Sequence, residues 1–376
     1  MNIPFNKPYI TGKETDYIRE AMLSGKISGD GIFTRKCQQF FEARYGFKKT
    51  LLTTSCTDAL EMAAILCDIQ PGDEIIAPSY TFVSTVNAFV LRGAKIVFAD
   101  SERITPNIDA ALIESLITPR TKAIVPVHYA GMACEMDTIL DIAQRHMLFV
   151  VEDAAQSIDS FYKGRPLGSL GHFGAFSFHD TKNIISGEGG MLAINDEHFL
   201  ARAEIIREKG TNRSAFFRGE VNKYGWVDIG SSFLPSDIIA AFLYAQLENL
   251  ESIQLRRKQI WNWYRELLEP LWESDLLELP VIPPNATNNG HMFYFVCKSL
   301  GQRTRLIEYL KEHGIMAPFH YLSLHNSLYY HDRHDGRALP NADRFSDCLI
   351  RLPMYYEMSM TDTEYIAEAL NNFFLK

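Results

Sequence analysis

The chain has 376 residues, of which 47% are hydrophobic and 22% charged, and its formal net charge is −9 at pH 7. This length is enough for two domains that share a cleft, and the composition is typical of a globular protein with a large core. The acidic balance argues against a nucleic-acid partner, because nucleic-acid-binding surfaces carry a basic surplus. No stretch reaches transmembrane length and the first residues do not form a targeting signal, so we expect a cytoplasmic protein without membrane insertion.

The first predicted elements are a helix over residues 15–24, a glycine turn over residues 28–31, and a second helix that begins near Phe33. Glycines on both sides of Asp30, at Gly29 and Gly31, permit the close approach of another backbone or of a ligand. A plain interhelical turn has the same sequence features, so the local sequence leaves both interpretations open.

A strand over residues 51–54 leads into an amphipathic helix that follows Ser55. Ser55 can cap this helix, and Asp58 is placed three residues later as in a capping box. The free N–H groups of Cys56 and Thr57, together with the positive end of the helix dipole, would then suit a phosphate. Every helix needs a cap, so a purely structural role also remains open.

The next predicted strands cover residues 74–77, 95–100 and 122–129, and helical segments alternate with them. This alternation predicts a mainly parallel sheet in an α/β fold. Phe82 follows the first of these strands, where an aromatic ring can stack on a flat ligand or pack in the core.

Asp153 ends a continuous apolar run, residues 148–151, of the kind found in parallel strands buried on both faces. Ligands of open α/β sheets bind at such carboxyl ends. A carboxylate there can pair with the ring nitrogen of pyridoxal phosphate or simply cap a helix. Gln156 lies three residues later and can project from the same helical turn.

Lys182 follows a short apolar strand and precedes a glycine-rich stretch, residues 186–190. Its amine can condense with an aldehyde only when neutral, which requires a site that lowers its pKa. The alternative is a solvated surface lysine, which is the commoner case. Ser177 lies at the edge of the same strand, and His179 between them can shuttle a proton or only line a wall.

A long helical pattern begins near residue 237 and bends near residues 248–251. We expect a domain boundary there, between a large domain of residues 1–250 and a smaller domain of residues 251–376. The smaller part is predicted to be α+β, with strands over residues 292–296 and 314–317 and a helix over residues 304–313. His320 and His325 have no carboxylate or cysteine at ligand spacing, so we expect no metal.

The segments around Asp153 and Lys182 resemble those of the DegT-type, pyridoxal-phosphate-dependent nucleotide-sugar aminotransferases, and the resemblance extends over nearly the whole chain. It implies an aspartate-aminotransferase-like fold, fold type I, with a mainly parallel seven-stranded sheet in the large domain and an α+β C-terminal domain. It also implies that Lys182 binds pyridoxal 5′-phosphate, that Asp153 pairs with its ring nitrogen, and that a homodimer shares its active sites.

The same resemblance implies roles for other residues of these motifs. Two positions depart from the family pattern, because Cys56 stands where glycine is common and Ser232 stands at an asparagine position. Further implied cofactor contacts within one chain are Ser55, Cys56, Thr57, Phe82, Gln156 and Ser177. Ser232 is implied to contact the cofactor in the partner subunit's site. Implied substrate contacts are Gly29, Asp30, His179, Glu188, His320 and Tyr321.

Within the family, the resemblance is to the branch that makes dTDP-4-amino-4,6-dideoxygalactose for enterobacterial common antigen. It implies that L-glutamate is the amino donor and dTDP-4-keto-6-deoxy-D-glucose the acceptor. The C4-epimeric product stays open, because the sequence does not reveal which sugar face meets Lys182. A 3-keto acceptor stays open as well. A sugar dehydratase with the same fold would have histidine in place of Lys182, so the lysine of this chain disfavours that activity. A non-catalytic binding protein would lose Lys182, Asp153 or Gln156, and all three are present.

Overall fold

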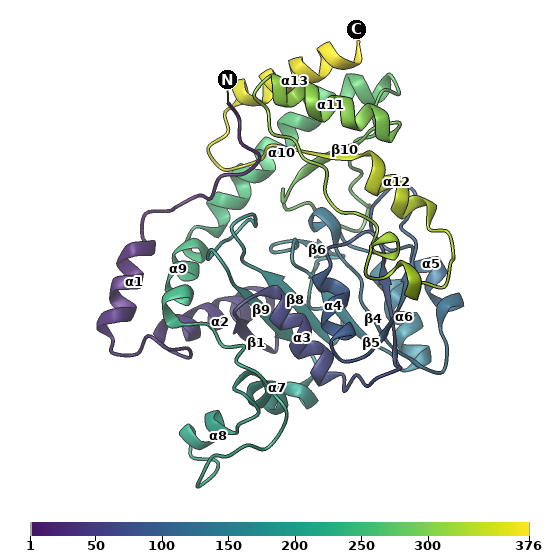
Figure 1. Ribbon diagram of the computed structural model, residues 1–376. Helices are drawn as coiled ribbons and strands as arrows, with labels where there is room; N and C mark the ends of the chain where they lie inside the picture. The colour runs from purple at the N-terminus through teal and green to yellow at the C-terminus, as the bar shows by residue number, and fades with distance from the viewer. Residues whose placement is uncertain (1, 376) are drawn as a thin grey trace.

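The computed structural model describes residues 2–375, and the chain folds around one large sheet (Figure 1). The first two helices, α1 (Glu14–Leu23) and α2 (Ile32–Tyr45), pack against α9 (Asp237–Glu248). One face of α2 is apolar, with Phe33, Cys37 and Phe41 buried and Phe40 half-buried. The N–H groups of Phe33 and Thr34 donate to the buried carboxylate of Asp237, which ties α2 to α9.

The central sheet has seven strands in the order β1-β9-β8-β5-β4-β2-β3. Strand β9 runs antiparallel to both of its neighbours, whereas the other pairs are parallel. The predicted fold class, a mainly parallel sheet in an α/β fold, is therefore confirmed. The strands are β1 (Lys49–Thr53), β2 (Glu74–Pro78), β3 (Lys95–Ala99), β4 (Thr121–Ile124), β5 (Phe149–Asp153), β8 (Phe173–Ser177) and β9 (Gly190–Ile194).

Helices cover both faces of this sheet (Figure 1). Alternate residues of one strand enter different cores, because successive side chains point to opposite faces. In β2, Ile75 and Ala77 join one buried cluster, while Ile76 joins another that also contains Ile139. The covering helices are α3 (Cys56–Leu66), α4 (Ser84–Val90), α5 (Ala110–Ile113), α6 (Met136–His146) and α7 (Leu200–Arg207). Helix α8 (Arg213–Phe217) contacts α7 and projects away from the sheet (Figure 1). Strands β6 (Phe161–Tyr162) and β7 (Arg165–Pro166) form a small hairpin.

The bend predicted near residue 249 is present, because Asn249 separates α9 from α10 (Leu250–Glu273). The C-terminal part contains a two-stranded antiparallel sheet of β10 (Phe293–Val296) and β11 (Leu349–Leu352), with α11 (Leu300–Glu312), α12 (Pro340–Cys348) and α13 (Met360–Phe374). The division into domains at residue 250 stays a prediction.

The strand predicted over residues 314–317 is wrong. Ile315 makes an isolated bridge to Ile3, through hydrogen bonds of 2.8 and 3.1 Å that join Ile3 to the backbones of Gly314 and Met316. Ile315 and Ala317 are buried, whereas Met316 is exposed, and the run contacts the N-terminal segment instead of joining a sheet. Within residues 2–375, no helix is both long enough and apolar enough to cross a membrane.

Candidate active site

A cavity of about 570 Å³ lies at the carboxyl ends of strands β1, β2, β5 and β8. Parallel strands end at the same edge of a sheet, so side chains from distant parts of the sequence meet there. Of the predicted site residues, those outside this cavity are Gly29, Asp30 and Ser232. The lining residues are Ser55, Cys56, Thr57, Leu60, Thr81, Phe82, Ser84, Val127, Asp153, Ala155, Gln156, Ser177, His179, Thr181, Lys182, Glu188, Gly189, His320, Tyr321 and Arg351.

Lys182 lies on the turn that follows β8, and its backbone N–H donates to the His179 carbonyl at 2.9 Å. Burial lowers the pKa of the Lys182 amine, and the positive charge of Arg351 acts in the same direction. Cys56 and Asp153 oppose this shift. A lowered pKa increases the neutral fraction of the amine, which is the form that attacks an aldehyde.

Asp153 is the last residue of β5, and its side chain is only 6% exposed. Burial raises the pKa of its carboxyl group, although two hydrogen bonds oppose the shift. The Thr85 hydroxyl donates to one carboxylate oxygen at 2.7 Å, and the Ala155 N–H donates to the other at 3.2 Å. Within residues 2–375 no cation forms an ion pair with this carboxylate, so a positively charged ligand atom would stabilise its ionised form.

The N-terminus of α3 forms another end of the cavity. Ser55 caps the helix as predicted, with its hydroxyl accepting a hydrogen bond from the Asp58 N–H at 3.0 Å. The Asp58 carboxylate accepts a hydrogen bond from the Thr54 hydroxyl, so it does not complete the expected capping box. The Thr57 hydroxyl donates to that of Ser84 at 2.8 Å. Backbone donors, hydroxyls and the helix dipole together provide a site for a phosphate.

Gln156 is held between two parts of the chain. Its side-chain oxygen accepts a hydrogen bond from the Ala130 N–H at 2.6 Å, and its amide nitrogen donates to the Tyr321 hydroxyl at 3.0 Å. The Phe82 ring is 55% exposed and its centroid lies 6.1 Å from that of Tyr321. An exposed ring at the cavity is available for stacking, whereas a core ring would be buried.

His320 stacks on Tyr321 with a centroid separation of 3.5 Å. Its Nδ1 lies 2.7 Å from the hydroxyl of the buried Tyr129. Burial lowers the pKa of His320 well below its usual value, and Arg351 and Lys182 add to the effect. His320 is therefore a neutral hydrogen-bonding group at neutral pH rather than a cation.

His179 and Glu188 lie at the more exposed mouth of the cavity. The His179 ring has one nitrogen 2.9 Å from Asp180 and the other 3.8 Å from Glu188. This placement agrees with a wall position and leaves both side chains accessible to a ligand.

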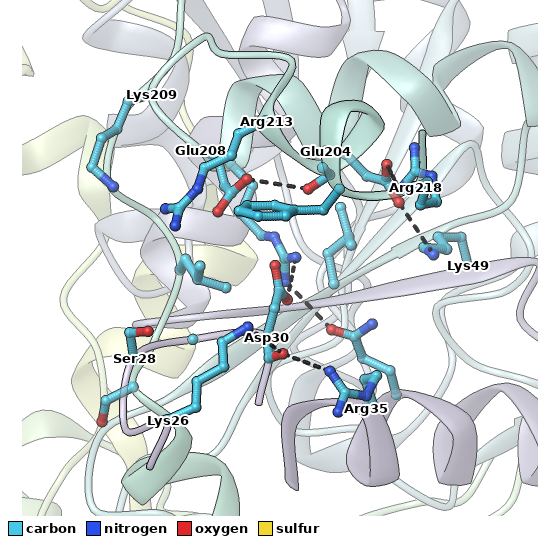
Figure 2. Close-up of a pocket in the computed structure, with 18 residues that line it drawn as sticks. Lys26, Ser28, Asp30, Arg35, Lys49, Glu204, Glu208, Lys209, Arg213 and Arg218 are labelled. Carbon is cyan, nitrogen blue, oxygen red and sulfur yellow. Dashed lines mark hydrogen bonds and ion pairs between the residues drawn. The ribbon is translucent and has the colours of Figure 1, made fainter. Parts of the chain in front are cut away.

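Gly29 and Asp30 line a different cavity, of about 800 Å³, that Figure 2 shows. The Asp30 carboxylate pairs with Arg207 at 2.7 Å in this cavity. The close backbone approach predicted for the glycine turn is confirmed, because a Cβ at Gly29 would overlap Leu234 and one at Gly31 would overlap Asp237. The structure therefore does not place this turn beside Lys182 in the same chain.

Ser232 is exposed and its backbone bridges to Glu208, outside the cavity that contains Lys182. The expectation that it reaches a partner's site stays a prediction. The sequence interpretation missed Thr81, Thr85 and Arg351, which also line or support the cavity. Among residues 2–375, no group of three or more His, Cys, Asp or Glu side chains is arranged to hold a metal ion.

The donor set of the cavity fits pyridoxal phosphate. A lysine with a lowered pKa, a buried carboxylate that forms no ion pair with any described residue, and a helix N-terminus with hydroxyl groups face one space. These groups match the aldehyde, the ring nitrogen and the phosphate of this cofactor. A volume of about 570 Å³ is within the range of small-molecule sites.

Comparison with known proteins agrees with this fit. The profile of the DegT/DnrJ/EryC1/StrS aminotransferase family matches residues 8–371. The spore coat polysaccharide biosynthesis protein SpsC of Bacillus subtilis is 34% identical over 379 residues, which cover 98% of this chain and 96% of SpsC.

Solved structures are also similar. Spr1654 from Streptococcus pneumoniae, whose structures include PLP and PMP forms, superimposes with TM-scores of 0.91 and 0.92 at 26% and 27% identity, covering 99% of this chain and 98% and 99% of Spr1654. DesV from S. venezuelae, solved with a ketimine intermediate, gives a TM-score of 0.91 at 28% identity, covering 100% of this chain and 99% of DesV. The chain therefore belongs to the DegT/DnrJ/EryC1/StrS aminotransferase family, and its cofactor is pyridoxal phosphate.

Proposed function

We propose that this aminotransferase moves the amino group of L-glutamate to C4 of dTDP-4-keto-6-deoxy-D-glucose, giving dTDP-4-amino-4,6-dideoxy-D-galactose. The observation that carries the proposal is the arrangement of Lys182 and Asp153, which face one cavity from the ends of adjacent strands. The sugar acceptor is supported by the sequence resemblance and by similarity to a polysaccharide biosynthesis protein. The product would enter cytoplasmic synthesis of a surface polysaccharide such as enterobacterial common antigen.

Pyridoxal phosphate supplies, when bound, a protonated ring that withdraws electrons from the donor Cα. Lys182 holds the cofactor between turnovers, and its freed amine moves a proton from the donor Cα. Asp153 would hold the ring nitrogen, and its ionised carboxylate, which the Thr85 hydroxyl and the Ala155 N–H favour, would keep that nitrogen protonated. Ser55, Thr57 and Ser177 orient the phosphate with the N-terminus of α3.

At the substrate end, His320 and Tyr321 form the wall against which the sugar is placed, and His179 and Glu188 contact it at the mouth. Gly29 and Asp30 act in the second cavity, where we propose that they contact the nucleotide part of a substrate. The enzyme acts as a homodimer, in which Ser232 reaches the cofactor phosphate in the partner's site.

Incubation with dTDP-4-keto-6-deoxy-D-glucose, L-glutamate and pyridoxal phosphate, followed by proton NMR of the sugar product, tests this function. A small coupling between H3 and H4 is expected, because the galacto product has an axial amine at C4. A large coupling would assign the C4 epimer, dTDP-4-amino-4,6-dideoxy-D-glucose, and an unchanged sugar would contradict the acceptor.

A further inference from the structure

A small cavity of about 50 Å³ lies beside Lys182. Several residues, Lys182 among them, line both this cavity and the larger one, so the two cavities adjoin. Its size suits a small group such as a carboxylate and excludes a nucleotide sugar. The shared lining residues are Gln156, Thr181, Lys182, His320 and Arg351.

The charges around this small cavity are all of one sign. Lys182, Arg257 and Arg351 line it, and none of its described lining residues is Asp or Glu. His291 and His320 also line it, but burial lowers the pKa of each well below the usual value, so both are neutral. The two arginines remain charged when the Lys182 amine is neutral. Positive charge that is removed from water without a counter-ion is unfavourable, so the cavity favours an anionic group.

The two arginines differ in what they already bind. Arg257 donates from Nε to the Gly290 carbonyl at 2.9 Å and from Nη2 to the His291 carbonyl at 2.7 Å. These two hydrogen bonds fix the Arg257 guanidinium against the backbone. Arg257 therefore adds positive charge to the cavity but has a mainly structural role.

Arg351, by contrast, has an N–H donor without a partner among the described residues. Its Nη2 donates to the Phe319 carbonyl at 3.0 Å and its guanidinium lies 4.5 Å from the centroid of the Phe5 ring. Its Nε is buried and has no hydrogen-bond partner within residues 2–375. A guanidinium that is held on two sides and has a free buried N–H is preorganised for a carboxylate.

We propose that Arg351 binds the α-carboxylate of the amino donor. This carboxylate is attached to the donor Cα, which carries the nitrogen that displaces Lys182, so it must lie within a few bonds of the Lys182 position. The diphosphate of a nucleotide sugar is attached at the far side of the sugar from C4 and does not reach this space. The inference rests on the proposed use of an α-amino acid as donor.

Equilibrium titration with 2-methyl-L-glutamate, which has no Cα hydrogen and cannot be transaminated, measures donor binding through the absorption of the bound cofactor. Arg351→Gln should weaken this binding by roughly 10- to 100-fold, because a charge-assisted hydrogen bond is lost. Arg305→Gln makes the same change of charge at an exposed position of α11 and should bind as the wild type does.

Two further measurements test the assignment, and the first uses only the wild-type protein, so it does not depend on the folding of Arg351→Gln. L-glutamate 1-amide, which lacks the α-carboxylate, should bind the wild-type protein roughly 10- to 100-fold more weakly than L-glutamate does. The KM for the nucleotide sugar, measured from the aminated cofactor form, should be unchanged in Arg351→Gln. Equal binding of acid and amide, or a loss confined to the nucleotide sugar, would overturn the assignment of Arg351.

The donor reaction is followed without any nucleotide sugar, so a wrong sugar acceptor leaves these results unchanged. A wild-type protein that gives no spectral response to L-glutamate would overturn the proposed donor, and with it the assignment of Arg351. A wrong sugar acceptor and a wrong amino donor therefore give different results.

Discussion

Burial acts in opposite directions on the two central residues of the cavity. It lowers the pKa of Lys182 and raises that of Asp153, because it disfavours the charged form of each. A neutral amine is the reactive form of Lys182, whereas Asp153 must be ionised to hold a protonated ring. The hydrogen bond from Thr85 to Asp153 therefore has a functional consequence, since it favours the ionised carboxylate.

Thr85→Val should move the acid limb of the pH profile of kcat/KM to higher pH by about one unit. The hydroxyl lowers the pKa of Asp153, so its removal raises that pKa further and leaves less ionised carboxylate at low pH. Thr34→Val is the matched control, because it removes another buried hydroxyl that donates to a carboxylate, that of Asp237. Neither residue lines the cavity, so the pH profile of this variant should match that of the wild type. An identical shift in both variants, or no shift in Thr85→Val, would show that Thr85 does not tune Asp153.

At the residue scale, the apolar runs before Lys182 and Asp153 made both residues candidates, but a surface lysine and a helix-capping aspartate stayed possible until the resemblance of their segments to an aminotransferase family favoured the cofactor roles. The structure brings both residues to one cavity. Arg351 carries no such signal, since it lies within a strand of four residues and becomes a cavity residue only when β11 pairs with β10. Thr85 was missed because a hydroxyl in a helix has many structural uses.

At the scale of elements, the phosphate end of the cavity depends on the junction of β1, β9 and β8. Gly190, the first residue of β9, is paired with Thr53 on one side and Ser177 on the other. A Cβ at this position would overlap the backbone of Ser55 at the start of α3. The glycine therefore allows the helix N-terminus and two strand ends to approach one another closely.

Gly190→Ala should lower the free energy of unfolding by about 1–3 kcal/mol and weaken cofactor binding, because the added methyl group displaces the N-terminus of α3. Denaturant unfolding and a cofactor titration measure the two effects. Gly225→Ala is the matched control, since a Cβ there meets nothing within 4 Å and the backbone is not left-handed. Wild-type cofactor affinity in Gly190→Ala would contradict the role of this junction.

The sequence predicted the βα alternation of the large sheet, but it did not predict β9 or β11, which are strands of five and four residues. Strand length does not explain this, because β2 and β5 were predicted and also have five residues. Both β9 and β11 are antiparallel strands, outside the βα alternation on which the prediction depended. The strand over residues 314–317 was wrongly predicted because Ile315 and Ala317 are buried without joining a sheet, and Ile315 makes only a bridge to Ile3. Such long-range partners are not visible in a local pattern.

At the scale of the whole molecule, the N-terminal segment links the C-terminal part to the cofactor turn. The carbonyl of Phe5 accepts a hydrogen bond from the Met354 N–H at 3.1 Å, and the Asn6 amide donates to the Asp180 carbonyl at 3.1 Å. Farther along, Tyr9 stacks on Tyr356 at 3.8 Å. The segment therefore helps to fix the position of Arg351 relative to the turn that carries Lys182.

The proposed shared site predicts the result of subunit mixing. Lys182→Ala and Ser232→Trp should each be inactive alone, the second because a bulky side chain would enter the partner's phosphate site. A mixed dimer would have one site with an intact Lys182 and an intact partner Ser232, so mixing should restore activity.

The control is a mixture of Lys182→Ala with Asp153→Asn. Both residues belong to the cavity of one chain, so neither site of this mixed dimer is intact and the activity should stay low. Full activity of Ser232→Trp alone, or no recovery on mixing well-folded dimers, would contradict a contribution of Ser232 to the partner's site.

Reduction of the purified holoenzyme with sodium borohydride, followed by mass spectrometry of its peptides, identifies the lysine that holds the cofactor. We expect the phosphopyridoxyl group on Lys182, because its amine has a lowered pKa and faces the cavity with Asp153. A phosphopyridoxyl group on another lysine, or an unmodified protein that still transfers nitrogen, would rule out the role of Lys182.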